Sequence, residues 1–272
     1  MLKRTISTIV GIAILLPILY FSDTFVFPVA VAFFIAVALF EIFGCVGQRK
    51  NILLTAPLYL FGIAAPFAVR YMTASSHYLI AGMLALNIIL LYFFALIVFS
   101  KNKINLSAAA SVFFPALYII IAFCGIIYLR DLRIGNFYLL IFISAWVTDI
   151  FAYLTGMLFG KHKLIPELSP KKTIEGSIGG MVFSAAAFTV TALLLGIPPI
   201  GLPVIIVCGL LASFVAQVGD LSMSAVKRQY GVKDFGKLMP GHGGVLDRFD
   251  SILAVSLFMT VMFAIIELLG LG

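Results

Sequence analysis

A short polar segment near the C-terminal end of the chain combines residue types that bind metal ions and phosphates. Asp220, Ser224, Lys227 and Arg228 follow one another at helical spacing, so they share one face of a predicted helix that Gly231 ends. A carboxylate, a hydroxyl and two cations on one face favour a metal ion bound beside a phosphate. An exposed helix with a helix-spaced ion pair would explain this segment alone equally well.

A glycine-rich turn follows, in which three glycines surround His242. The backbone N–H groups around Gly243 and Gly244 can approach an anion closely, as they do in phosphate-binding nests. Lys233 and Asp234 precede this turn and add one charge of each sign. The turn therefore favours a phosphate ligand.

The next acidic pair, Asp247 and Asp250, stands three residues apart at a predicted helix start. This spacing puts both side chains on one face, where they could hold a divalent cation together with Asp220. Helix capping would explain one of the two aspartates, but it does not explain Arg248 between them.

The polar loop 160–176 contains a second cluster of cations and hydroxyls, with Lys171, Lys172 and Thr173 in a Ser-Pro-Lys-Lys-Thr run. These groups are suited to binding phosphates. Asp149 precedes the loop by about ten residues, roughly 15 Å of helix. Tyr153, Gly156 and Gly160 lie on the same helix face as Asp149. Because an unpaired carboxylate in lipid is costly, we expect Asp149 to line a polar cavity that reaches down from the cytoplasm.

The composition of the chain indicates the class of protein that must position these residues. The chain has 272 residues, of which 63% are hydrophobic and 11% charged, whereas an ordinary soluble domain has roughly 25% charged residues. A water-soluble globule is excluded, and the apolar runs predict a multi-span membrane protein. The net charge of +7 is assigned to anchors at the ends of spans and not to nucleic-acid binding.

About nine runs are long enough to cross the hydrocarbon core as helices. The predicted spans are residues 5–22, 25–46, 52–70, 78–99, 107–129, 137–159, 177–195, 202–219 and 250–269. The turn 196–201 separates two of them. Because backbone groups in lipid must be bonded within the chain, the predicted fold is an all-α, polytopic transmembrane helical bundle. Glu41 lies near the inner end of the second span, where snorkelling or a local pair explains it.

The distribution of basic residues predicts the orientation of the chain in the membrane. Fifteen of the 18 Lys and Arg residues fall on the side that contains the N-terminus and the loops 160–176 and 220–249. The positive-inside rule places that side in the cytoplasm of a cell membrane. Seven of the eleven acidic residues lie between positions 149 and 250, so residues 1–130 are interpreted as a scaffold and 131–272 as a catalytic region.

The 27-residue pattern Ser224-x2-Lys-Arg-x4-Lys-Asp-x5-Pro-Gly-His-Gly-Gly-x2-Asp-Arg-x-Asp250 resembles the signature of the phosphatidate cytidylyltransferase family, also called CDP-diacylglycerol synthases. The segments 159–164 and 169–176 resemble the same family. The resemblance implies that an oxygen of phosphatidate attacks the α-phosphorus of CTP, which gives CDP-diacylglycerol and pyrophosphate.

The resemblance also suggests roles for the residues above. Mg²⁺ is the implied cofactor, with Asp220 and Asp247 as its main ligands, Asp250 assisting, and a second cation compatible with the site. The expected phosphate contacts are Lys227, Arg228, Lys233, Arg248, Ser224, Lys171, Lys172 and Thr173. His242 is assigned either a phosphate contact or a structural hydrogen bond, Gly243 and Gly244 line the substrate site, and Asp234 tethers Lys233 or Arg228.

Two alternatives are also compatible with the sequence. A CTP-dependent polyprenol kinase would transfer the terminal phosphoryl group of CTP. A secondary transporter of an anionic solute would also explain Asp149 and the basic loops, although it predicts internal repeats that the sequence lacks. Glycine and alanine in the later spans would permit a homodimer.

Overall fold

The computed structural model describes residues 11, 13–72, 78–101, 103–132, 136–196, 201–238 and 243–268. Their elements follow one another in the order α2 (Val26–Cys45), α3 (Ile52–Met72), α4 (Tyr78–Phe99), α5 (Leu106–Asp131), the 3₁₀ turn η1 (Asn136–Tyr138), α6 (Leu139–Phe159), β1 (Lys163–Ile165), β2 (Ser169–Thr173), α7 (Ile174–Leu194), α8 (Leu202–Gln229) and α9 (Leu246–Leu268). The predicted all-α class is confirmed, with one small hairpin added.

Among the described residues, eight helices are long and apolar enough to cross a membrane. They match the predicted spans from the second to the ninth within a few residues, except that α8 continues ten residues past its predicted span, and the chain is a multi-pass membrane protein. Of the first predicted span, 5–22, residues 5–10 and 12 lie outside the described residues, and residues 13–20 are helical. The turn predicted at 196–201 separates α7 from α8, with positive φ at Gly196 and Gly201.

The chain divides into two compact units. The first contains residues up to Ile127 together with the segment Asp234–Asp247, and the second contains Tyr128–Lys233 and the residues from Arg248 onward. The predicted division into a scaffold and a catalytic region concerns function, and it stays a prediction.

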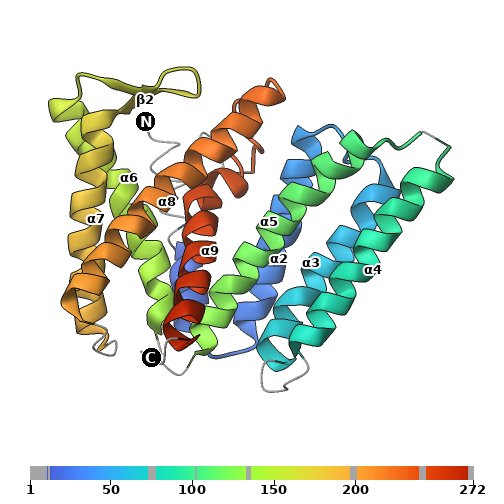
Figure 1. Ribbon diagram of the computed structural model, residues 1–272, viewed down its shortest axis with the longest axis horizontal. Coiled ribbons are helices and arrows are strands. Elements are labelled where there is room, and N and C mark those ends of the chain that lie inside the picture. Colours follow the sequence, from blue (N-terminus) through green and yellow to red (C-terminus); the bar gives the residue numbers. More distant parts are fainter. Residues whose placement is uncertain are drawn as a thin grey trace. The chain divides into compact units, whose positions relative to one another are not determined.

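The first unit is built on helices α2 to α5. α3 packs against α2 and against α4 (Figure 1). Gly62 of α3 makes close approach possible, because a Cβ there would lie 2.8 Å from Ile35 of α2 and 3.3 Å from Ile120 of α5. The core is apolar, and its aromatic contacts include the stacked rings of Phe34 and Phe123.

The second unit is centred on α6, α7 and α8, which pack against one another (Figure 1). Glycines permit the α6–α7 contact: a Cβ on Gly176 would lie 2.6 Å from the Ala152 carbonyl oxygen, and one on Gly180 would lie 3.0 Å from that of Thr148. Gly156 and Gly160 also face Thr173 and Gly176. These two glycines therefore permit the close approach of Thr173, and their predicted place beside a polar cavity stays a prediction.

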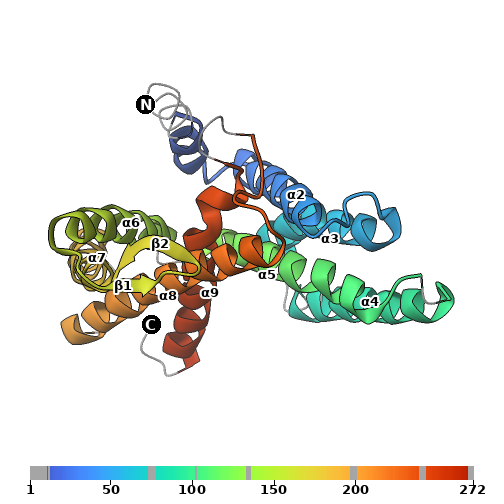
Figure 2. The ribbon, with the colours of Figure 1, turned by 90° about the horizontal axis from the view of Figure 1, so that it is seen from above.

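An antiparallel hairpin, β1–β2, links α6 to α7 and contacts the ends of both helices (Figure 2). It forms the loop that the sequence predicted only as polar. α7 begins three residues earlier than predicted, because Thr173 is its N-cap and its Oγ1 accepts a hydrogen bond from the Gly176 N–H at 3.1 Å.

Candidate active site

Helix α8 extends past its apolar part to Gln229, as predicted, and Gly231 follows it with φ +67. Ser224 Oγ lies 3.5 Å from Asp220 Oδ1, and Lys227 is buried with 8% of its surface exposed. Arg228 is exposed, and its Nη1 donates to the Val232 carbonyl at 3.0 Å. The helix thus directs Asp220 and Lys227 into the second unit, while Arg228 binds the turn that follows the helix.

The hairpin brings a cation to this face of α8. Lys172 on β2 forms an ion pair with Asp220, with 2.5 Å between Nζ and Oδ2. Both side chains are about one-quarter exposed, at 25% and 27%. Glu175 at the start of α7 stabilises the hairpin, since its carboxylate accepts hydrogen bonds from the backbone N–H groups of Lys161 and His162.

Three aspartates from three helices of the second unit interact with one another: Asp149 of α6, Asp220 of α8 and Asp250 of α9. Asp250 is 7% exposed, whereas Asp149 is exposed. Ser251 links two of them, because its Oγ lies 3.4 Å from Asp149 Oδ2 and 3.4 Å from Asp250 Oδ1. We call Asp149, Asp220 and Asp250 the aspartate cluster.

Three cations accompany the aspartate cluster within the same unit. Lys172 and Arg248 interact electrostatically with Asp149, and Lys227 interacts with Asp250. Three neighbouring carboxylates would repel one another strongly if no positive charges lay near them. Carboxylates are the kind of ligand that a divalent cation prefers, and basic side chains are the kind that binds phosphate oxygens. The roles predicted for these residues in metal and phosphate binding stay predictions.

The glycine-rich segment belongs to the first unit. Asp247 Oδ2 accepts hydrogen bonds from the N–H of Phe235 at 2.8 Å and of Gly244 at 2.9 Å. Gly243 has φ +83, in the region that favours glycine. Asp247 therefore holds the backbone of Phe235 and that of Gly244 together. Its predicted role as a metal ligand stays a prediction.

The sequence interpretation missed two residues, Ser251 and Glu41. Glu41 was expected to snorkel or to pair locally, and snorkelling is wrong because the side chain is buried. Beside an electrostatic interaction with the nearby Arg49, its carboxylate accepts hydrogen bonds from the N–H of Val245 and Leu246, more than 200 positions away. The available signal was its charge, since an acidic residue within an apolar span is costly and usually has a partner.

The remaining predicted site residues are more peripheral. Lys171, Lys233 and Asp234 are exposed. Thr173 is buried, and its hydroxyl caps α7. His242 lies outside the described residues. The roles predicted for these residues stay predictions.

The donor chemistry of the aspartate cluster suits Mg²⁺, which prefers carboxylate and water oxygens. Over the described parts of the chain, no group of three or more His, Cys, Asp and Glu side chains is arranged closely enough to hold a metal ion. A cation at this position would therefore compete with Lys172 for Asp220 and depend on water for further ligands.

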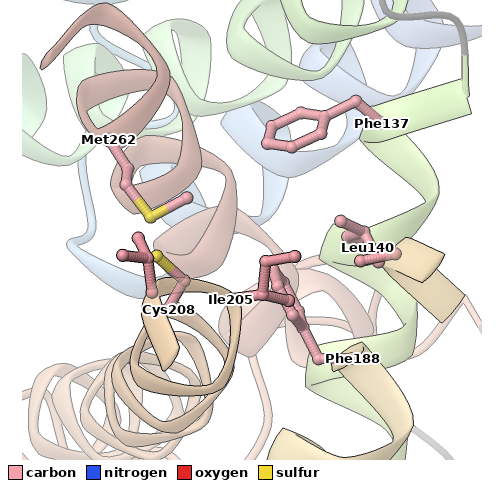
Figure 3. Close-up of a pocket in the computed structure, with 8 residues that line it drawn as sticks. Phe137, Leu140, Phe188, Ile205, Cys208 and Met262 are labelled. Atoms are coloured by element: carbon pink, nitrogen blue, oxygen red, sulfur yellow. The ribbon is translucent and has the colours of Figure 1, made fainter. Parts of the chain in front are cut away.

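The second unit also has an apolar pocket, to which α6, α7, α8 and α9 contribute (Figure 3). Phe137 lies in η1 and Leu140 at the start of α6, and Ile205 and Cys208 lie near the start of α8. Asp149 and Asp220 come several turns later along the same helices. The pocket is therefore separate from the aspartate cluster, and its lining side chains are hydrocarbon or sulfur-containing.

Comparisons with known proteins show the family of this chain. The model of the "Cytidylyltransferase family" matches residues 2–266. A phosphatidate cytidylyltransferase of Staphylococcus haemolyticus is 32% identical over 95% of this chain and 97% of its own length. Proteins of the same name from Staphylococcus saprophyticus (38% identical, 66% of this chain and 67% of that protein) and Staphylococcus aureus (40%, 61% and 63%) are also similar. The chain belongs to the cytidylyltransferase family.

Proposed function

We propose that this chain is a phosphatidate cytidylyltransferase, which transfers CMP from CTP to phosphatidate and gives CDP-diacylglycerol and pyrophosphate. The observation that carries the proposal is the aspartate cluster with Lys172, Lys227 and Arg248 around it, in a membrane protein of the cytidylyltransferase family. Three carboxylates beside three cations suit a reaction between two polyanions.

The reaction needs positioning and charge neutralisation more than a protein nucleophile. A phosphatidate oxygen supplies the electron pair for the new P–O bond to the α-phosphorus, and the bond between that phosphorus and the bridging oxygen of pyrophosphate breaks. The phosphate monoester is already anionic at neutral pH, so no side chain must activate it. The residues of the site must bring the two anions together and stabilise the leaving pyrophosphate.

The described geometry supports specific roles. Asp220 and Asp250 would hold Mg²⁺, which when bound neutralises the triphosphate, and Asp149 would line the same site. Lys172, Lys227 and Arg248 would contact phosphate oxygens.

The other proposed contacts are secondary. The proposed phosphate contacts outside the aspartate cluster are Ser224, Lys171, Lys233 and Arg228, and Asp247 is proposed as a further metal ligand. A second cation and a homodimer also stay predictions.

The site would face the cytoplasm. CTP is water-soluble, whereas phosphatidate stays in the bilayer, so a site at the membrane surface can reach both substrates. The basic loops support this orientation through the positive-inside rule.

The test follows the α-phosphate of CTP. Purified protein in detergent is incubated with phosphatidate, Mg²⁺ and CTP labelled at the α-phosphate, beside Asp220→Asn and the control Glu267→Gln, whose side chain is exposed near the end of α9. We expect label in chloroform-soluble lipid for the wild type and the control, and a loss of about 100-fold or more for Asp220→Asn. Transfer from γ-labelled CTP alone would establish a kinase, and no transfer of either label would overturn the proposal.

A further inference from the structure

Glu41 is a buried acidic residue in the apolar helix α2. It is 3% exposed, and its neighbours Leu39, Ile42 and Phe43 are fully buried apolar residues. A carboxylate in such surroundings is costly unless it is hydrogen-bonded. The position of Glu41 therefore calls for a specific partner within the first unit.

The partner is the start of α9. Glu41 Oε1 accepts a hydrogen bond from the Val245 N–H at 3.0 Å, and Oε2 accepts one from the Leu246 N–H at 2.8 Å. The first N–H groups of a helix have no acceptor within the helix, and the helix dipole favours a negative charge there. Glu41 thus caps α9 from a distant helix and uses both of its oxygens.

Two glycines of the segment 234–247 fit closely around this carboxylate. A Cβ on Gly236 or on Gly244 would overlap the carboxyl group of Glu41. Neither glycine has a positive φ, so backbone conformation alone does not require glycine at these positions. The close approach to Glu41 explains them both.

Glu41 and Asp247 together bind three consecutive backbone N–H groups. Asp247 Oδ2 accepts from Gly244, and Glu41 accepts from Val245 and Leu246. The backbone that Glu41 fixes is therefore the backbone that orients the Asp247 carboxylate. If Glu41 releases Val245 and Leu246, the backbone of residues 244–246 loses its anchor on α2.

We propose that Glu41 is a positioning residue for cytidylyl transfer, because it anchors the backbone of residues 244–246, which leads into α9, to α2. For its kinetic part the inference rests on the proposed function. Its structural part concerns only the two backbone N–H groups and the two glycines. The two parts are therefore measured separately.

The first measurement is amide hydrogen exchange of peptides that cover residues 243–250 in detergent. In Glu41→Gln, the side-chain amide has one acceptor oxygen where the carboxylate has two, so one N–H group loses its partner. We expect exchange in this segment to speed up by about tenfold, the equivalent of one charge-assisted hydrogen bond. Glu267→Gln is the matched control, and we expect wild-type exchange from it. Unchanged exchange in Glu41→Gln would overturn the anchor.

The second measurement separates positioning from general stability. At a temperature well below the unfolding midpoint of each variant, we expect Glu41→Gln to lower kcat by about tenfold, with KM for phosphatidate within about twofold of the wild type. A purely structural residue would lower the unfolding midpoint and leave kcat of the folded protein unchanged, and that result would overturn the proposal. If the wild type shows no cytidylyl transfer, the proposed function fails, while the exchange experiment still tests the anchor.

Gly244→Ala gives an independent variant, because its Cβ would displace the Glu41 carboxylate. We expect the same kcat and exchange phenotype as in Glu41→Gln, and in the double variant a loss no greater than that of the more severe single variant. Losses that add fully in the double variant would overturn the shared mechanism. Gly82→Ala, on α4 with open space around its Cβ, is the control for glycine substitution.

Discussion

The ion pair between Lys172 and Asp220 leads to a prediction about cation binding. Lys172 Nζ lies 2.5 Å from Asp220 Oδ2, so the ammonium group occupies the side of the carboxylate that a divalent cation would use. In the nucleotide-free enzyme, a cation must displace Lys172 or share Asp220 with it. Lys172→Met removes both the competitor and its positive charge, and each change favours cation binding.

The size of the effect follows from the exposure of the pair. Two unit charges about 4 Å apart attract by about 4 kcal/mol at an effective dielectric constant of about 20. Both side chains are about one-quarter exposed, at 25% and 27%, and fully exposed pairs have a net value of about 0–1 kcal/mol because of solvent screening and lost side-chain entropy. A net value of about 1–2 kcal/mol is therefore reasonable, which corresponds to about a 5- to 30-fold change in affinity.

The assay is calorimetric titration of the nucleotide-free protein in detergent with Mg²⁺, with Mn²⁺ binding by electron paramagnetic resonance as a second measurement. We expect Lys172→Met to bind the cation about 5- to 30-fold more tightly and, in the activity assay, to raise KM for CTP because a phosphate contact is lost. The control is Lys163→Met, an exposed lysine on strand β1 of the same hairpin. Unchanged or weaker cation binding in Lys172→Met would refute the competition between the ammonium group and the cation.

Two further predictions concern the second unit. Gly176→Ala places a Cβ 2.6 Å from the Ala152 carbonyl oxygen, so α6 and α7 must separate. We expect the free energy of unfolding to fall by about 1–3 kcal/mol, which would lower the thermal unfolding midpoint in detergent. A midpoint equal to that of the wild type would contradict the close α6–α7 contact. Ser251→Ala removes the hydroxyl that lies 3.4 Å from both Asp149 and Asp250, and we expect about fivefold weaker Mg²⁺ binding, about 1 kcal/mol, with an unchanged unfolding midpoint. Equal Mg²⁺ affinities of wild type and variant would show that this hydroxyl does not organise the aspartates.

The spans were predictable because lipid leaves the backbone few choices. An apolar run of about 20 residues must form a helix that satisfies its own hydrogen bonds, so composition alone locates α2 to α9. The predicted boundaries are wrong where polar residues decide them. Thr173 starts α7 earlier than its apolar run suggests, and α9 starts at Leu246 although its uninterrupted apolar run begins several residues later.

The hairpin β1–β2 could not be predicted from the same rules. Its strands are three and five residues long, and their side chains are mostly polar and exposed, so they lack the alternation that identifies a strand. Two local features stabilise it instead: the Glu175 carboxylate accepts the N–H groups of Lys161 and His162, and Thr173 caps α7. Such side-chain bonds to the backbone depend on the fold that brings them together.

The candidate site was partly predictable, because helical spacing within one segment is visible in a sequence. Asp220 and Lys227 were predicted to share one helix face, and both interact with Asp250. The charge of Asp149 within an apolar run indicated a specific role, and Asp149 interacts with Asp220. The pairing of Lys172 with Asp220 is a contact between a hairpin and a helix that lie far apart in the sequence, and no spacing rule predicts it. The contact of Glu41 with Val245 crosses a still longer interval.

These contacts also show why a dense sequence signature does not identify a metal site by itself. Asp247 and Asp250 are three residues apart and look equivalent in the sequence, yet Asp247 binds the backbone of the glycine-rich loop in the first unit, and Asp250 interacts with Asp149 and Asp220 in the second. Asp250 also accepts hydrogen bonds, from the N–H and the hydroxyl of the adjacent Ser251, but it lies beside two other carboxylates. The hydrogen bonds from Phe235 and Gly244 hold the Asp247 carboxylate against the glycine-rich loop instead. Asp250→Asn should therefore weaken Mg²⁺ binding more than Asp247→Asn does, whereas Asp247→Asn should speed up amide exchange at Gly244. Equal loss of Mg²⁺ affinity in the two variants, with unchanged exchange at Gly244, would show that Asp247 serves the metal and not the loop.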